Sequence, residues 1–207
     1  MREVPEDRSH AFGQATTPSF VDRLGIRLSG RRIRRHVRDF SGKRFGDFGC
    51  GYQAIFARSV LDLVKTAVLV DLALAPDLRS HPKVEAIEGA LPGGLAGIET
   101  GSLDVILCIS VLEHLWVPLT TLEEIRRISA PGGMVLINVP SWRGKRYLEF
   151  SAFRLGLSPA DEMDDHKAYY DPKDLWPLLV RAGFRPSGIR CFTHKLGLNT
   201  FAVCRTE

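Results

Sequence analysis

The chain has 207 residues, of which 44% are hydrophobic and 25% are charged. These proportions are those of an ordinary globular protein and exclude wholesale disorder. The net charge of +4 is too small to indicate a nucleic-acid-binding protein. A membrane-spanning helix needs about 18 uninterrupted apolar residues, and no stretch of the sequence comes near that length. The first residues are charged and do not resemble a secretion signal.

The cysteines and histidines give no sign of a metal motif. Cys50, Cys108, Cys191 and Cys204 are widely scattered, without a C-x-x-C pair, and the histidines form no cluster along the chain. The sequence therefore predicts neither a metal site nor a disulfide framework. This cysteine usage favours the reducing cytoplasm as the compartment.

Residues 1–40 are expected to form an N-terminal extension with arginine-rich helices. Apolar residues recur at helical spacing from Ser19 to Phe40, and Gly25 and Gly30 are expected to break this stretch into two helical pieces. Eight arginines and one lysine between residues 23 and 44 stand against a single acid. This run is either a solvated helix face or a docking surface for phosphate or another acidic partner.

From residue 41 to residue 207 the pattern is that of one doubly wound α/β domain. Buried parallel strands appear as continuous apolar runs, and the helices between them return the chain to the same end of the sheet. The last two strands are expected to form an antiparallel hairpin through Lys195–Gly197, and residues 140–170 a lid over the ligand-binding edge. The predicted strands are 44–48, 67–70, 84–87, 103–109, 134–139, 184–192 and 198–204, and the predicted helices are 52–63, 73–78, 119–128 and 172–182.

The most informative segment follows the first predicted strand and reads Asp-Phe-Gly-Cys-Gly, from Asp47 to Gly51. Gly49 and Gly51 allow backbone angles and close approaches that a side chain would block. Asp47 can accept hydrogen bonds from a cationic amine. Asp71 ends the next strand, 20 residues after Gly51, where an acid can bind both hydroxyls of a ribose.

Two further strand ends complete the predicted ligand site. The third strand leads to Glu88-Gly89-Ala90-Leu91, whose small residues would let an adenine ring lie against the backbone. The fourth strand leads to Ile109 and Ser110, followed by Val-Leu-Glu-His-Leu. The carboxyl ends of these parallel strands meet at one edge, so the four segments are expected to lie together.

In this order the segments resemble the motifs of class I S-adenosylmethionine-dependent methyltransferases of the small-molecule type. Similar turns stand at residues 129–133 and 181–184, and the resemblance covers roughly residues 43–205, although Gln53 replaces a frequent third glycine. It implies a Rossmann-like seven-stranded sheet, S-adenosylmethionine as cofactor and S-adenosylhomocysteine as product. The implied cofactor-binding residues are Asp47, Gly49, Cys50, Gly51, Asp71, Leu72, Ala90, Leu91, Ile109 and Ser110.

Two alternatives remain open at this stage. Residues 49–54 also satisfy the dinucleotide fingerprint G-x-G-x-x-A, which would make the chain a nicotinamide-dependent oxidoreductase. Asp47 argues against this alternative, because its charge would lie near the pyrophosphate. A non-catalytic nucleoside-binding or scaffold protein is the third interpretation.

His114 and His166 are the candidate catalytic residues. A methyl acceptor often has to lose a proton, and histidine is the natural base near neutral pH. His114 follows the fourth strand, and His166 resembles a histidine that precedes the penultimate helix in many small-molecule methyltransferases. Each is alternatively a structural histidine. The resemblance favours a small-molecule acceptor, such as a sugar or another surface-glycan precursor, over nucleic acid, and the sequence sets no oligomeric state.

Overall fold

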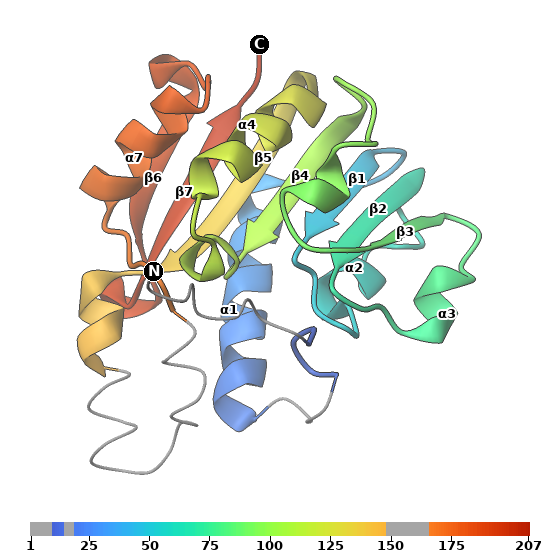
Figure 1. Cartoon of the computed structure of the whole chain (residues 1–207), viewed down its shortest axis with the longest axis horizontal. Helices are drawn as coiled ribbons and strands as arrows, with labels where there is room; N and C mark the ends of the chain where they lie inside the picture. Colours follow the sequence, from blue (N-terminus) through green and yellow to red (C-terminus); the bar gives the residue numbers. More distant parts are fainter. Residues whose placement is uncertain (1–9, 15–18, 148–165) are drawn as a thin grey trace, which may run out of the picture.

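The computed structural model describes residues 10–14, 19–147 and 166–207. Within these ranges, seven strands form one mixed sheet in the order β3-β2-β1-β4-β5-β7-β6 (Figure 1). The first five run parallel, and β7 is antiparallel to both β5 and β6, which confirms the predicted fold class and the C-terminal hairpin. The strands are β1 Arg44–Phe48, β2 Thr66–Asp71, β3 Val84–Glu88, β4 Leu103–Ile109, β5 Ser129–Pro140, β6 Ile189–His194 and β7 Asn199–Arg205.

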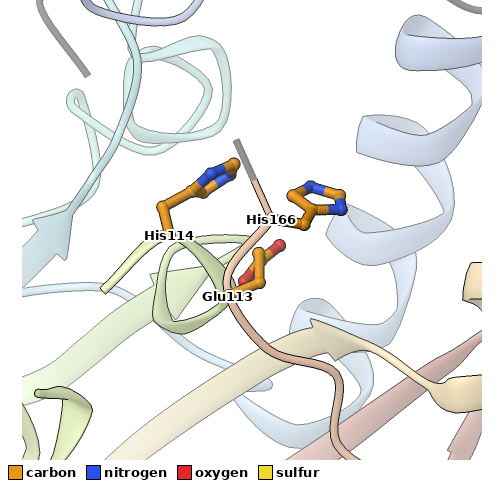
Figure 2. Close-up of side chains that lie close together, drawn as sticks. All are labelled: Glu113, His114 and His166. Carbon is orange, nitrogen blue, oxygen red and sulfur yellow. The ribbon is translucent and has the colours of Figure 1, made fainter. Parts of the chain in front are cut away.

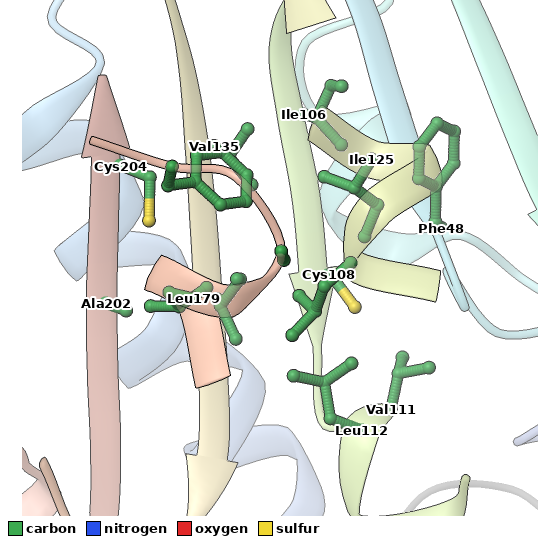
Figure 3. Packing of buried hydrophobic residues seen from close by; sticks show 14 of the residues in the cluster. Phe48, Ile106, Cys108, Val111, Leu112, Ile125, Val135, Leu179, Ala202 and Cys204 are labelled. Atoms are coloured by element: carbon green, nitrogen blue, oxygen red, sulfur yellow. The ribbon is translucent and has the colours of Figure 1, made fainter. Parts of the chain in front are cut away.

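Helices cover both faces of the sheet. Side chains of α4 and α7 pack with one set of strand residues, such as Cys108 and Val135 (Figure 3). Side chains of α1, α2 and α3 pack with the opposite set, such as Leu107 and Leu136. Each fully buried aliphatic side chain contributes about 1.5–3 kcal/mol, so the two layers hold the strand ends in fixed register. The helices are α1 Phe20–His36, α2 Ile55–Arg58, α3 Pro76–Arg79, α4 Pro118–Ile128 and α7 Pro172–Arg181.

The helix α1 is continuous, so the expected break at Gly25 and Gly30 is wrong. Each interior glycine costs a helix about 0.5–1 kcal/mol relative to alanine, but Ser19 and Asp22 form a reciprocal capping box at the first turn. Ile33 and the following Val37 are buried against the sheet. Gly30 also has a packing role, because a Cβ there would stand 3.4 Å from the Phe56 ring.

The helix predicted over residues 52–63 is also wrong in extent. Only Ile55–Arg58 is α-helical, and Ala54 before it adopts a left-handed conformation with φ of 41°. Turns with i→i+3 hydrogen bonds continue to Leu63 and keep Val60 buried, so the apolar spacing of a helix appears without its hydrogen bonds. The strand predicted over residues 184–192 begins only at Ile189, because Pro186 opens a 3-10 turn.

The chain after β5 is described only at its two ends. Residues 142–147 are helical, and residues 166–170 lead into α7. Asp171 and Asp174 form a capping box that fixes the start of α7. The central part of the predicted lid, including the acidic cluster from Asp161 to Asp165, lies outside the described residues.

Candidate functional site

The turn after β1 has the geometry that its glycines predict. Gly49 and Gly51 have φ of 74° and 75°, in the left-handed region that favours glycine. A Cβ on Gly49 would overlap Cγ2 of Val111, so the turn packs directly on the segment after β4. On the other side, Tyr52 N–H donates to the carbonyl of Phe12 over 2.9 Å, which places residues 10–14 beside Gly51.

Asp71 faces this turn from the end of β2. Its Oδ2 accepts a hydrogen bond from Gly51 N–H over 2.7 Å, and its Oδ1 accepts one from Leu72 N–H over 2.8 Å. Hydrogen bonds to a charged group contribute roughly 1.5–3 kcal/mol each, so the carboxylate orders the turn in this structure. The two neighbouring strand ends therefore meet as the sequence predicts.

Asp47 is a buried acid beside the glycine turn. Its side chain is 5% exposed, and burial raises its pKa to about 8, with a further contribution from the charge of Asp71. A cation placed beside the two carboxylates would offset both effects. Cys50 lies next to them, and burial raises the pKa of its thiol, so it is not a reactive thiolate.

The adenine-side residues lie apart from the main cavity. Glu88 Oε1 accepts a hydrogen bond from Leu74 N–H over 2.8 Å, which links the ends of β2 and β3. Ala90 is exposed, and Leu91 packs at the edge of the hydrophobic core. Among the described residues that line the cavity, Asp71, Leu72, Ala90 and Leu91 do not appear.

The end of β4 brings Ile109 and Ser110 to the cavity wall. Ser110 has φ of 58°, a conformation that is costly for a residue other than glycine. Its N–H donates to the carbonyl of Asn138 over 2.7 Å, which fixes the turn into the next segment. The amide group of Asn138 is fully buried and has no hydrogen-bond partner among the described residues.

His114 and His166 come together although 52 residues separate them, and Glu113 lies between them (Figure 2). The imidazole centroids are 4.9 Å apart. One ligand atom from each of the three side chains lies within 4.8 Å of the others. Glu113 is 2% exposed, whereas both histidines are partly exposed.

Main-chain hydrogen bonds hold His166 in this place. Lys167 N–H donates to the carbonyl of Glu113 over 2.7 Å, and Ala168 N–H donates to the same oxygen over 3.3 Å. Tyr170 N–H donates to Pro140 over 3.0 Å. The segment is thus attached to the ends of both β4 and β5 before α7 begins.

A cavity of about 400 Å³ joins the glycine turn to this cluster. That volume suits a small organic ligand. Its walls come from the turn after β1, the segment after β4, the N-terminal half of α1 and the C-terminal hairpin. Of the predicted residues it is lined by Asp47, Gly49, Cys50, Gly51, Ile109, Ser110, His114 and His166, and it is also lined by Glu113 and Lys195, which the sequence did not single out.

Lys195 is the cation of this cavity. Burial lowers its pKa to about 8, and the negative charge of Glu113 partly opposes that shift. Its Nζ stands 3.6 Å from the place that a Cβ on Gly25 of α1 would occupy. No local signal in the sequence marks Lys195, because it lies in the turn between the last two strands.

The fold is that of the S-adenosylmethionine-dependent methyltransferases. A family model described as a methyltransferase domain matches residues 16–186, and the chain belongs to that family. The match decides against the nicotinamide and scaffold alternatives, and S-adenosylmethionine is the cofactor. No helix among the described residues is long and apolar enough to cross a membrane.

Curated relatives match most of the chain. A ubiquinone biosynthesis O-methyltransferase of Ralstonia nicotianae is 28% identical over 159 residues, which are 72% of this chain and 66% of that protein. The protein of the same name from Neisseria meningitidis is 25% identical over 177 residues, 80% of this chain and 74% of its own length. The chain thus spans about two thirds to three quarters of these two relatives.

Solved structures share the fold at low sequence identity. A SAM-dependent methyltransferase from Archaeoglobus fulgidus has a TM-score of 0.63 at 14% identity, with 91% of this chain and 100% of that chain covered. A methyltransferase in complex with the Haloferax volcanii Trm112 activator has a TM-score of 0.61 at 14% identity, covering 88% and 92%.

The residues present fit this cofactor. S-adenosylmethionine carries a cationic sulfonium and a cationic amine, and Asp47 and Asp71 supply two adjacent carboxylates, one of them desolvated. Gly49 and Gly51 both line the cavity. We propose that Asp47, Gly49 and Gly51, which line the cavity, and Asp71, which bonds to Gly51, would hold it.

Proposed function

We propose that the protein transfers a methyl group to a hydroxyl oxygen of a small-molecule acceptor bound in the cavity. The observation that carries this proposal is the Glu113, His114 and His166 cluster on the same cavity wall as the glycine turn. The names of the curated relatives as O-methyltransferases support an oxygen acceptor. The sugar or surface-glycan precursor expected from the sequence resemblance stays a prediction about the acceptor.

The cofactor, when bound, supplies a methyl group on positively charged sulfur. The protein's part is to hold the acceptor oxygen in line and to manage its proton. His166 is suited to that task, because its Nδ1 lies 3.2 Å from Tyr169 Oη. When the phenol oxygen accepts from Nδ1–H, the imidazole lone pair lies on Nε2, the nitrogen that would accept a hydroxyl proton.

Other side chains favour a polar acceptor of limited size. Lys195 lines the cavity and can bind an anionic or hydroxyl group of the acceptor. Val21 and Ile26 of α1 supply apolar wall for a ring or a chain. The four cysteines are free thiols, which fits the cytoplasmic location that we propose.

The test is methyl transfer from labelled S-adenosylmethionine to matched pairs of acceptors. Each pair consists of a hydroxylated phenol or sugar and its analogue without that hydroxyl. We expect label only in the hydroxylated member, with the methyl ether identified by mass spectrometry. Transfer to nitrogen or carbon, or equal labelling of both members, would refute the oxygen acceptor.

A further inference from the structure

We propose that Glu113, His114 and His166 bind a divalent transition-metal ion such as Zn²⁺ on the acceptor side of the cavity. The proposal deepens the function proposed above and rests on it for the ion's role, whereas ion binding itself can be measured alone. The sequence predicts no metal site, because residues 113–114 and 166 are far apart in the chain. The fold supplies the juxtaposition.

The ligand set has the composition of a known class of metal centre. Two imidazoles and one carboxylate bind zinc in catalytic sites that keep an open position, and they bind iron(II) in the facial triad of oxygenases. Nitrogen donors favour Zn²⁺ and Co²⁺ over Mg²⁺ and Ca²⁺, which prefer oxygen ligands. The donor set therefore points to a borderline first-row ion.

The distances require only a small adjustment. Metal–ligand bonds of about 2.0–2.2 Å put neighbouring ligand atoms roughly 3–4 Å apart. The three donor atoms already lie within 4.8 Å of one another. Rotation of the partly exposed imidazoles closes the difference, while the main-chain bonds from Lys167 and Ala168 to Glu113 stay intact.

Two surrounding features resemble those of metal ligands. Tyr169 Oη lies 3.2 Å from His166 Nδ1. An outer-shell partner in this place orients the imidazole and leaves Nε2 as the atom that binds the metal. Glu113 is buried in the cavity wall, where a bound cation would favour its charged form. Lys195 lies in the same cavity and belongs to the same charge balance.

The ion would have a defined role in the proposed reaction. A three-ligand site leaves a position for the acceptor hydroxyl, whose pKa falls on coordination. With the ion bound, the hydroxyl proton leaves to solvent and His166 serves as a ligand, whereas without the ion His166 would accept that proton as proposed above. The proposed site therefore requires an acceptor whose hydroxyl can reach the ion from within the cavity.

The experiment is titration of tag-free protein with Zn²⁺ by calorimetry after chelator treatment, with Co²⁺ as a spectroscopic probe. We expect one ion per chain and visible Co²⁺ absorption typical of nitrogen ligands. Loss of an outer-shell partner lowers metal affinity about 10- to 100-fold. We expect a larger loss of Zn²⁺ affinity from each ligand substitution, Glu113→Gln, His114→Ala and His166→Ala. The exposed Glu123→Gln on α4 and His81→Gln before β3 are matched controls that should leave affinity unchanged.

Binding of S-adenosylhomocysteine to each variant shows that it is folded. Absence of a one-to-one site in folded protein, or a site that survives all three substitutions, overturns the metal proposal. If Zn²⁺ binds as expected but hydroxylated acceptors receive no methyl group, the metal site stands and the proposed function fails. If methyl transfer to oxygen persists at full rate in chelator-treated protein, the ion's role in the reaction is refuted.

Discussion

The two ends of the site, which we propose as a cofactor half around Gly51 and an acceptor half around His166, are built in different ways. The cofactor half comes from two adjacent strand ends, where Gly51 and Asp71 meet through a hydrogen bond of 2.7 Å. The acceptor half joins segments that are far apart in the chain, with His166 held beside Glu113 by main-chain bonds. Local motifs therefore determine the first half, whereas the second depends on the whole fold.

The largest expected effect is a loss of turnover without a loss of cofactor affinity, which would distinguish the acceptor half from the cofactor half. His166→Ala should lower turnover by about 100-fold or more, in the range typical of lost proton-transfer groups. Its affinity for S-adenosylhomocysteine should stay within twofold, because His166 belongs to the acceptor half. Steady-state kinetics and calorimetry on the same preparation test both, with His81→Ala as control. Activity equal to that of the parent would remove His166 from the reaction.

Two glycines with similar backbone angles test the packing of the glycine turn. Gly42 has φ of 67° with nothing within 4 Å of a Cβ, whereas a Cβ on Gly49 would overlap Val111. Gly42→Ala should cost about 1–2 kcal/mol of backbone strain. Gly49→Ala should cost about 1–3 kcal/mol more, because it also overpacks the core. Urea unfolding of both variants measures the difference, and equal losses would contradict it.

Asp71→Ala tests the predicted ribose acid. We expect affinity for S-adenosylhomocysteine to fall at least tenfold, or about 1.4 kcal/mol, since charged hydrogen bonds are lost. The turn at Gly51 also loses its acceptor, while the sheet persists. Calorimetry with circular dichroism measures both, and the exposed Glu85→Gln on β3 is the control. Unchanged affinity would place the ribose elsewhere.

The smallest effect is a pH dependence of cofactor binding. Asp47 has a pKa of about 8 in the free protein, so it is mostly protonated at pH 7. A bound cation lowers that pKa, so binding should release just under one proton and affinity should rise with pH up to about 8. Calorimetry of S-adenosylhomocysteine binding at pH 7 in two buffers of different ionisation heat counts the protons. Asp47→Asn should abolish the release.

The same shift predicts the sign of a stability effect. Because the pKa of Asp47 is higher in the folded than in the unfolded state, its contribution to stability is complete below about 4 and is lost as pH rises through about 8. Asp47→Asn should therefore reduce the loss of stability between pH 6 and roughly 9. An unfolding series over this range that shows no difference would mean that Asp47 is ionised in the free protein.

Most of the sheet could be predicted because its strands are buried on both faces and appear as apolar runs. Arg44–Phe48 and Leu103–Ile109 match the prediction at both ends. The helices were harder, because apolar spacing alone does not distinguish a helix from the turns that follow Arg58. Capping and packing, which kept α1 continuous through Gly25, depend on neighbours that only the fold supplies.

The site divides in the same way. Asp47, Gly49 and Asp71 were found because each lies in a short motif at a strand end. Glu113 precedes His114 in the segment after β4, but no local pattern predicts that its side chain is buried beside His166. Lys195 comes from a hairpin turn without a motif. Such residues are recognised only when distant segments are placed together.

Peptide groups make the hydrogen bonds that attach the His166 segment to Glu113. Since the bonding atoms at positions 167 and 168 are main-chain nitrogens, every amino acid except proline can supply them. These two hydrogen bonds therefore place no demand on the side chains at positions 167 and 168 beyond the exclusion of proline. New acceptor preferences could then arise by altering the cavity walls, with the reactive centre inherited intact.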